Sequence, residues 1–401
     1  MPIRILIYIG LAIIPFFLRA GQGTREPKME LALGLALAIC LLALFQGRFK
    51  ARWNPWFPAI LIYLMVSYPF APPPVELIKA NVPNLWAWKP TLAITIFMLM
   101  ILTISSLHLR LRDRRLMLSI MTWAGVVMSG YVFMQFFGVD QFCIQKPDWY
   151  WPNRIGGTMG NRTVVSPFIA MVIPLAIYLR RWWQAVIMFI AVAMCHGQMA
   201  VGAMVVSLLF LLGTRGRRRA MVTAGVLVVM SLTLVIGYAF SERGRGFIDD
   251  SGRFPAWKAT LEDWRQPSPE SAPYSHALTG LGVGSFSYVF HQQHDGEFNK
   301  PFRHAHNEYL QVLYEMGIIG LVLMLGAMVW VFKKNFSWRD VWYGRANHYR
   351  MCLLASFVCI SISALGAFVW QLAPNLFYTV VILGLLHKDM EANEVPATPN
   401  A

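Results

Sequence analysis

The chain has 401 residues, of which 57% are hydrophobic and only 14% are charged, with a mean hydropathy of +0.49. Soluble domains carry about 25% charged residues, so this composition excludes an ordinary water-soluble protein. The formal net charge of +15 would suit a nucleic-acid partner. A soluble nucleic-acid-binding domain does not combine such a charge with this apolar content, however, and we expect no nucleic-acid partner.

Apolar segments of membrane-spanning character recur along the whole chain, which predicts an all-α polytopic membrane protein with about twelve transmembrane helices. The expected spans are 3–18, 29–45, 56–70, 90–107, 116–137, 163–179, 182–195, 198–213, 220–240, 307–332, 351–371 and 373–387. No repeat, low-complexity segment or flexible linker divides the sequence. Residues 1–401 are therefore expected to form a single integral membrane domain, whose first span remains uncleaved.

The loops between these spans predict the orientation. With a cytoplasmic N-terminus, the cytoplasmic loops hold 18 Lys and Arg residues, whereas the short loops on the opposite side hold eight. This excess follows the positive-inside rule and predicts that both termini are cytoplasmic. Segment 241–305, between the ninth and tenth spans, is the only long hydrophilic stretch, and this topology places it outside as one large loop. A loop of that length between membrane helices commonly carries function.

The most specific pattern lies where this outer loop re-enters the membrane. His306 and Asn307 are followed, after nine residues, by Gly317 and Gly320. Asn307 is a favourable N-cap for the tenth span, with Glu308 in the first turn. The positive end of the helix dipole favours a neutral imidazole at His306, which is the form that a general base needs. The two glycines share a helix face and would admit a neighbouring helix. The alternative is an interfacial histidine beside a helix cap, with glycines that serve only packing.

This pattern resembles the signature of the O-antigen ligase and polymerase family of bacterial inner-membrane glycosyltransferases. Two further segments resemble the family: Arg253 with Trp257 downstream in the outer loop, and the Gly- and Asn-rich stretch 156–162 that leads into the sixth span. The resemblance implies a GT-C-like helical fold with a periplasmic active site. It also implies inverting transfer of an undecaprenyl-pyrophosphate-linked glycan to an acceptor hydroxyl, without a cofactor or a metal.

The resemblance also implies roles for individual residues. Arg253, and after it Arg162, would bind the pyrophosphate, because a guanidinium stays protonated and pairs bidentately with phosphate oxygens. His306 would accept the proton of the acceptor hydroxyl, or orient that hydroxyl. The alternative for either arginine is a solvated charge or a contact with lipid headgroups. Further candidates for substrate binding are Arg265, Arg303, His304, Asn307, Asn161 and Trp257. His304 lacks the nine-residue spacing to the glycine pair, so we prefer His306.

The start of the outer loop is predicted to be a short amphipathic helix at the outer interface, because apolar residues recur there at helical spacing. These are Phe254, Trp257, Leu261 and Trp264. Such a helix would present Arg253 at the depth of a lipid pyrophosphate, or else form a lid over the bundle. Gly280, Gly282 and Gly284 are expected to form a turn and not a nucleotide site, because no strand or helix start is expected beside them.

Three functions within the family, and one outside it, fit the sequence. A ligase uses lipid A–core as the acceptor, whereas a polymerase extends another lipid-linked glycan; a protein-directed glycan transferase is a third subtype. The other sizeable outer loop, 138–162, has about 25 residues, which favours a ligase because polymerases often show two large outer loops. A lipid or solute transporter is the alternative from another class. Transporters usually carry charged groups in the middle of the membrane. In this sequence such groups are scarce within the spans and gather at the outer rim, which favours an enzyme over a transporter.

Overall fold

The computed structural model is helical throughout the part of the chain that it describes. It describes residues 2–17, 26–48, 55–67, 85–139, 155–195, 197–219, 221–222, 253–265, 276–294, 297–298, 302 and 304–392. The helices of the first half are α1 (Pro2–Ile13), α2 (Glu26–Phe45), α3 (Trp56–Ser67), α5 (Leu85–Ser106), α6 (Leu111–Phe136), the short 3-10 helix η2 (Gly157–Met159) and α7 (Arg162–Tyr178). Those of the second half are α8 (Trp182–Met194), α9 (Gln198–Gly213), α12 (Arg253–Arg265), α13 (His276–Thr279), α14 (Phe286–Gln293), α15 (Glu308–Asn335), α16 (Trp338–Trp342), α17 (His348–Ser363) and α18 (Ala373–Ala392).

Eleven of the twelve predicted spans coincide with helices, and the remaining one, 220–240, lies almost wholly outside the described residues. Among the described residues, three helices are long and apolar enough to cross a membrane: Pro27–Phe45, Leu111–Phe136 and Glu308–Asn335. Shorter apolar helices account for most of the others. The class of a helical membrane protein is therefore supported, while the number of twelve spans and the periplasmic loop stay predictions.

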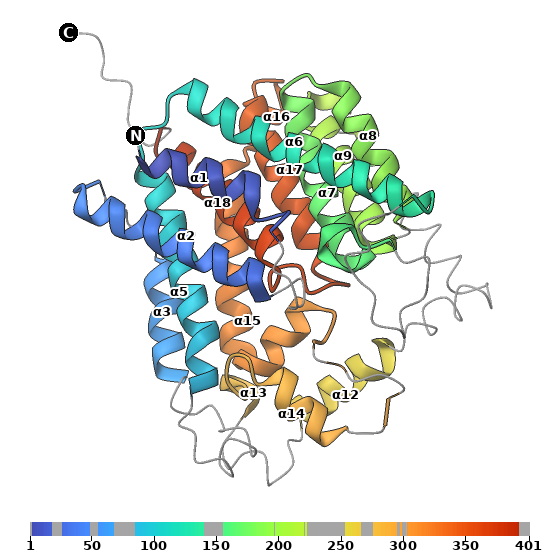
Figure 1. Ribbon diagram of the computed structural model, residues 1–401. Coiled ribbons are helices and arrows are strands. Elements are labelled where there is room, and N and C mark those ends of the chain that lie inside the picture. The colour runs from blue at the N-terminus through green and yellow to red at the C-terminus, as the bar shows by residue number, and fades with distance from the viewer. Residues whose placement is uncertain are drawn as a thin grey trace.

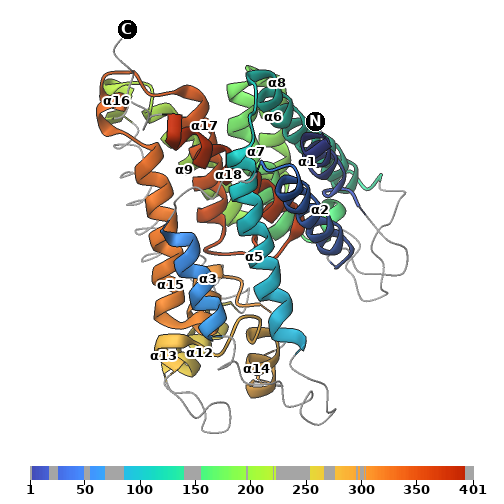
Figure 2. The same ribbon diagram turned by 90° about the vertical axis from the view of Figure 1, so that its left-hand side faces the viewer.

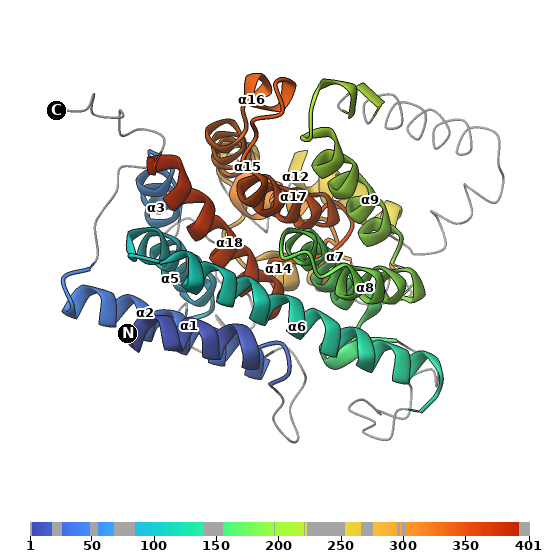
Figure 3. The same ribbon diagram turned by 90° about the horizontal axis from the view of Figure 1, so that it is seen from above.

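Helix α7 forms the centre of the bundle. Each residue from Val164 to Ala176 is buried, and α7 packs against α6, α8, α9 and α17, which surround it when the molecule is seen from above (Figure 3). Phe168 of α7 packs against Tyr378 of α18, with ring centroids 4.8 Å apart. Helix α18 in turn contacts α5 and α2. Because this apolar core is continuous, it fixes the N-terminal end of α7, where the candidate arginine Arg162 lies.

The short helices α12, α13 and α14 gather at one end of the bundle, and α16 lies at the opposite end (Figures 1 and 2). Helices α12, α13 and α14 all contact α15, so they pack on the N-terminal half of that long helix. The residues of the predicted outer loop that the structure describes are therefore held against the bundle and not extended away from it.

Helix α17 ends at Ser363, although the sequence predicted that this span continues to residue 371. Residues 364–372, which we call the 364–372 segment, leave the helix and run past the N-terminus of α15 before α18 begins. Hydrogen bonds from this segment to α15 compensate for the helical bonds that it gives up, as described below. The prediction of one continuous span over 351–371 is therefore wrong for the residues after Ser363.

Gly317 interrupts α15, with φ 62° and ψ −169°. This conformation is almost restricted to glycine. A Cβ at Gly317 would lie 2.3 Å from the backbone oxygen of Leu278 in α13. The expectation that Gly317 and Gly320 lie on one face of a regular helix is therefore wrong. The close approach occurs at Gly317 alone, whereas the atoms nearest to a Cβ at Gly320 belong to Met316 of the same helix.

The glycine-rich turn beside α13 is confirmed, since Gly280, Gly282 and Gly284 all have positive φ. A helix nevertheless starts directly after it at Phe286, contrary to the expectation from sequence. The backbone N–H groups of Gly284 and Phe286 donate to the carboxylate of Glu315 over 2.9 and 3.3 Å. The turn therefore binds an anion from within the protein, which leaves its donors occupied and argues against a nucleotide.

Candidate active site

The N-terminus of α12 carries Arg253, which is half-buried and donates from Nη1 to the carbonyl oxygen of Gly366 over 2.9 Å. Burial lowers the pKa of Arg253, and the like charge of Arg162 lowers it further. Arg162, the first residue of α7, is therefore close to Arg253, although the two are far apart in sequence. Neither guanidinium has an acidic partner among the described residues.

A tight turn positions Arg162. The backbone N–H groups of Gly156 and Gly157 donate to Oε1 of Gln135 over 2.9 and 2.8 Å, and η2 follows. A Cβ at Gly156 would lie 2.6 Å from the carbonyl carbon of Gly160, so only glycine fits there. The Gly- and Asn-rich stretch therefore serves to bring the chain sharply into α7.

Both histidines of the motif contact one aromatic ring of the 364–372 segment. The ring of His304 stacks on Phe368, with centroids 4.7 Å apart and an interplanar angle of 25°. The ring of His306 meets the same phenyl edge-on at 4.9 Å. Phe368 is two residues beyond Gly366, so their Cα atoms are at most about 7 Å apart. The segment that accepts the Arg253 hydrogen bond thus also contacts both imidazoles.

His306 adopts a left-handed backbone conformation, with φ 53°. Such a value is uncommon outside glycine and costs of order 1 kcal/mol or more, so surrounding contacts must maintain it. It turns the chain from the outer loop into α15 and leaves the imidazole only half-buried. Phe302 and Phe368 flank the ring, both edge-on.

Glu308, the first residue of α15, fixes both ends of the 364–372 segment. Its backbone N–H donates to the carbonyl of Ala364 over 2.9 Å. Its buried carboxyl group accepts hydrogen bonds from the backbone N–H of Trp370, over 2.9 Å, and from Nε2 of Gln371, over 3.2 Å. The sequence indicated only a first-turn acid here. The sequence does contain a signal that the predicted span ends early, because Gly366, Gln371 and the nearby Pro374 interrupt the apolar run.

The two asparagines of the predicted site act as helix caps. Oδ1 of Asn307 accepts from the N–H groups of Tyr309 and Leu310, over 3.1 and 3.2 Å, which confirms the predicted N-cap. Oδ1 of Asn161 accepts from the N–H and the hydroxyl of Thr163, both over 3.0 Å. The capping bonds account for both residues, and a contact with substrate stays a prediction.

The predicted loop helix is present as α12, and Trp257 donates from Nε1 to the carbonyl of Ala305 over 2.6 Å. Its most buried residues are, however, Ala256, Ala259 and Thr260, and Phe254 is 44% exposed. Small side chains let this helix approach α15 closely, so the alanine face is the most deeply buried side of α12. The Trp257 bond fixes α12 next to His306.

Arg265, one of the alternative arginines, does not join this cluster. Arg265 is the exposed last residue of α12, twelve residues beyond Arg253, which places it about 18 Å away along the helix axis. The interpretation of Arg265 as a substitute for Arg253 is therefore unsupported by the geometry. Arg303 lies outside the described residues.

A histidine that sequence reasoning missed ties α12 to the segment after α14. Nε2 of His294 lies 2.9 Å from Oδ2 of Asp263, and Nδ1 lies 2.5 Å from Oε2 of Glu297. Burial lowers the pKa of His294, but the hydrogen bonds and charges of Glu297 and Asp263 outweigh it and raise the pKa overall. No sequence pattern marks this pairing, because the three residues are separated by loop segments.

The fold and the site together define a helical membrane protein with paired guanidinium and imidazole groups at one end. A family model described as O-antigen ligase matches residues 183–325, from α8 to the middle of α15. The match confirms the family resemblance over these residues, and it indicates a membrane glycosyltransferase-type enzyme. Comparison with curated proteins gave no significant match. Arg253 and His306 lie within the matched residues, whereas Arg162 and the 364–372 segment lie outside them.

Proposed function

We propose that the protein transfers a glycan from undecaprenyl pyrophosphate to a hydroxyl of lipid A–core at the periplasmic face of the bacterial inner membrane. The observation that carries this proposal is the convergence of Arg253 and Arg162, without an acidic partner among the described residues, beside the motif histidines. Two like charges held together are unfavourable until an anion binds between them. A pyrophosphate supplies such an anion, and guanidinium groups match its oxygens bidentately.

In the proposed reaction, the acceptor oxygen attacks the anomeric carbon of the donor glycan from the side opposite the pyrophosphate. The bond between the anomeric carbon and the pyrophosphate oxygen breaks, and the electron pair leaves with undecaprenyl pyrophosphate, so the anomeric centre inverts. His306 accepts the hydroxyl proton as the new bond forms. Arg253 and Arg162 stabilise the negative charge that develops on the leaving group, which needs no metal ion in this scheme.

The orientation of the site supports this assignment. Arg253 is held by one Nη1 bond to Gly366, so its remaining N–H donors are available to a ligand. His306 is only half-buried as a residue, but its Nδ1 is buried, so the proposal requires the acceptor to approach Nε2. The imidazole and the guanidinium contact the same 364–372 segment, which gives the acceptor base and the leaving-group cation a fixed relation to each other.

The test uses the purified full chain in nanodiscs with an undecaprenyl-pyrophosphate glycan and lipid A–core, and it measures the release of undecaprenyl pyrophosphate. Loss of one preorganised charge-stabilising group typically costs about 100- to 1000-fold, so we expect Arg253→Ala and His306→Ala to lose transfer by at least about 100-fold. Arg265→Ala is the matched control, with the same helix and side chain but no place in the cluster, and should transfer normally.

The choice of acceptor separates the family subtypes. Transfer to lipid A–core identifies a ligase, whereas transfer only to a second lipid-linked glycan identifies a polymerase and refutes our choice. Failure to release undecaprenyl pyrophosphate with any acceptor would argue against the enzyme and for a transporter. Normal transfer by His306→Ala would remove His306 from the mechanism, with His304→Ala as the next variant to measure.

A further inference from the structure

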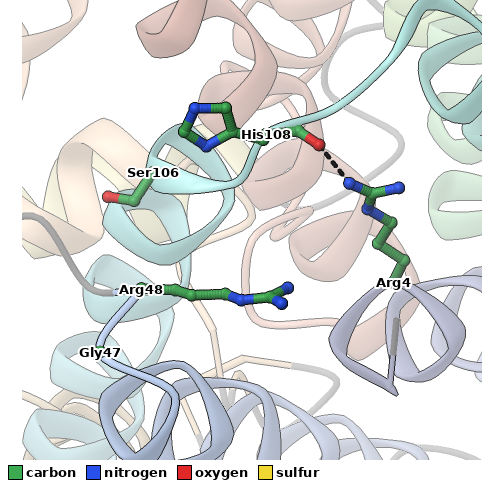
Figure 4. A pocket seen from close by; sticks show the side chains of 5 residues that line it. All are labelled: Arg4, Gly47, Arg48, Ser106 and His108. Atoms are coloured by element: carbon green, nitrogen blue, oxygen red, sulfur yellow. Dashed lines mark hydrogen bonds between the residues drawn. The ribbon is translucent and has the colours of Figure 1, made fainter.

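A basic cavity of about 360 Å³ opens far from the candidate active site. Arg4, Gly47, Arg48, Ser106 and His108 line it, and Figure 4 shows their side chains. They come from three parts of the chain: α1, the turn after α2 and the turn after α5. Helix α5 runs from the end where α12–α14 lie to the opposite end of the bundle (Figure 2), and the cavity is at its far end.

Among the described residues, an acidic group pairs with only one of the two arginines of the cavity. Arg4 forms an ion pair of 2.8 Å with Asp113 and donates to the His108 carbonyl oxygen (Figure 4). Asp113 also accepts from the Tyr8 hydroxyl and from a backbone N–H at the start of α6, so its carboxylate is shared among three donors. The side chains of Arg48 and His108 have no polar partner among the described residues.

Exposed apolar side chains adjoin the lining residues in the sequence. Ile5 follows Arg4 and is 44% exposed, and Leu111 comes shortly after His108 and is 72% exposed. Phe45 ends α2 just before the cavity-lining turn and is 85% exposed. A soluble anion would gain nothing from this apolar surface. A ligand that joins an anionic group to acyl chains would contact both the cavity and these side chains.

We propose that this cavity binds the phosphate group of an anionic phospholipid, with the acyl chains along the exposed apolar surface of α1 and α2. Figure 4 shows Arg48 extending across the cavity toward the side from which Arg4 enters, so a phosphate between them would receive N–H groups from both guanidiniums. The ring of His108 offers a further N–H group from the turn after α5. The predicted topology places this end of the bundle in the cytoplasmic leaflet, where anionic headgroups are held by basic residues. The site is independent of the proposed glycan transfer.

The test measures lipid binding to the purified full chain in a neutral detergent by native mass spectrometry. Phosphatidylglycerol is compared with phosphatidylcholine of the same acyl chains, and glycerol 3-phosphate serves as the headgroup without chains. Arg48→Gln removes one charged donor from an exposed residue, so the fold should be kept, which thermal unfolding checks. Arg339→Gln in α16 is the matched control, because Arg339 is an exposed basic residue that does not line the cavity.

We expect the wild type to retain phosphatidylglycerol in preference to phosphatidylcholine. Because a charge-assisted contact to phosphate is lost, Arg48→Gln should weaken phosphatidylglycerol binding by about tenfold, and Arg339→Gln should not. Equal phosphatidylglycerol affinity in the wild type and Arg48→Gln would overturn the proposal. Glycerol 3-phosphate that binds as tightly as phosphatidylglycerol would identify a soluble-anion site and also overturn it. If Arg48→Gln unfolds, His108→Ala replaces it, with the same outcomes.

Discussion

Replacement of Glu308 tests whether the 364–372 segment positions the reacting groups. Its carboxyl group accepts two hydrogen bonds, from the Trp370 N–H and from Nε2 of Gln371, over 2.9 and 3.2 Å. A hydrogen bond of this kind is worth about 0.5–1.5 kcal/mol, and Glu308→Ala removes the acceptor of both bonds. We expect this variant to lose about 2 kcal/mol of transition-state stabilisation, or about 30-fold in kcat/KM. Glu308→Gln keeps one acceptor oxygen, so its kcat/KM should fall by only about fivefold.

The assay compares transfer kinetics with thermal unfolding, so that a positioning effect is distinguished from simple loss of stability. Ser207→Ala is the control, because the Ser207 hydroxyl donates to the carbonyl of Ala355 over 2.7 Å at a buried site between α9 and α17. That variant should lose a similar amount of stability but transfer normally. If Glu308→Ala keeps the wild-type kcat/KM, or if the two variants lose activity in parallel, the segment does not position the site.

Three further outcomes follow from the contacts. Gly317→Ala should lower stability by at least about 2 kcal/mol in thermal unfolding, because the backbone there suits only glycine and a Cβ meets α13. His294 has a raised pKa, so its ion pair with Glu297 is fully formed below about pH 6.5 and is lost as the pH rises through the folded-state pKa. The free energy of unfolding should therefore fall over that rise in pH. His294→Gln should remove this loss of stability. Trp257→Phe should reduce transfer about fivefold, whereas Trp264→Phe, a control with a bond of 3.3 Å, should not.

Most of the helical architecture could be predicted from the apolar segments, because each span must satisfy its own backbone and bury its side chains in lipid or protein. The N-cap at Asn307 and the helix at Arg253–Arg265 followed from local chemistry as well. The two main departures, at Gly317 and after Ser363, arise from contacts between distant segments. Local periodicity carries no information about such contacts, since the interrupted residues remain apolar.

The members of the candidate site were proposed from the sequence, whereas the segment that contacts several of them was not. The motif spacing identified His306, and the resemblance identified Arg253 and Arg162. The element that joins His306 to Arg253 lies about sixty residues beyond His306, at Gly366 and Phe368, inside what the sequence presents as an ordinary span. A backbone carbonyl and an aromatic contact have no sequence signature, so this link required the structure.

The arrangement around the 364–372 segment explains how an unfavourable charge pair is kept ready for a ligand. Partial burial of Arg253 lowers its preference for the charged state, and the like charge of Arg162 adds to that effect. The pair is maintained because α7 is held by its buried core and α12 by the Trp257 bond to Ala305. In the proposed reaction, a bound pyrophosphate would relieve this repulsion, while neutral groups of the donor would not. Binding energy would then be concentrated on the group that gains negative charge as the glycosidic bond breaks, which is where it would lower the barrier.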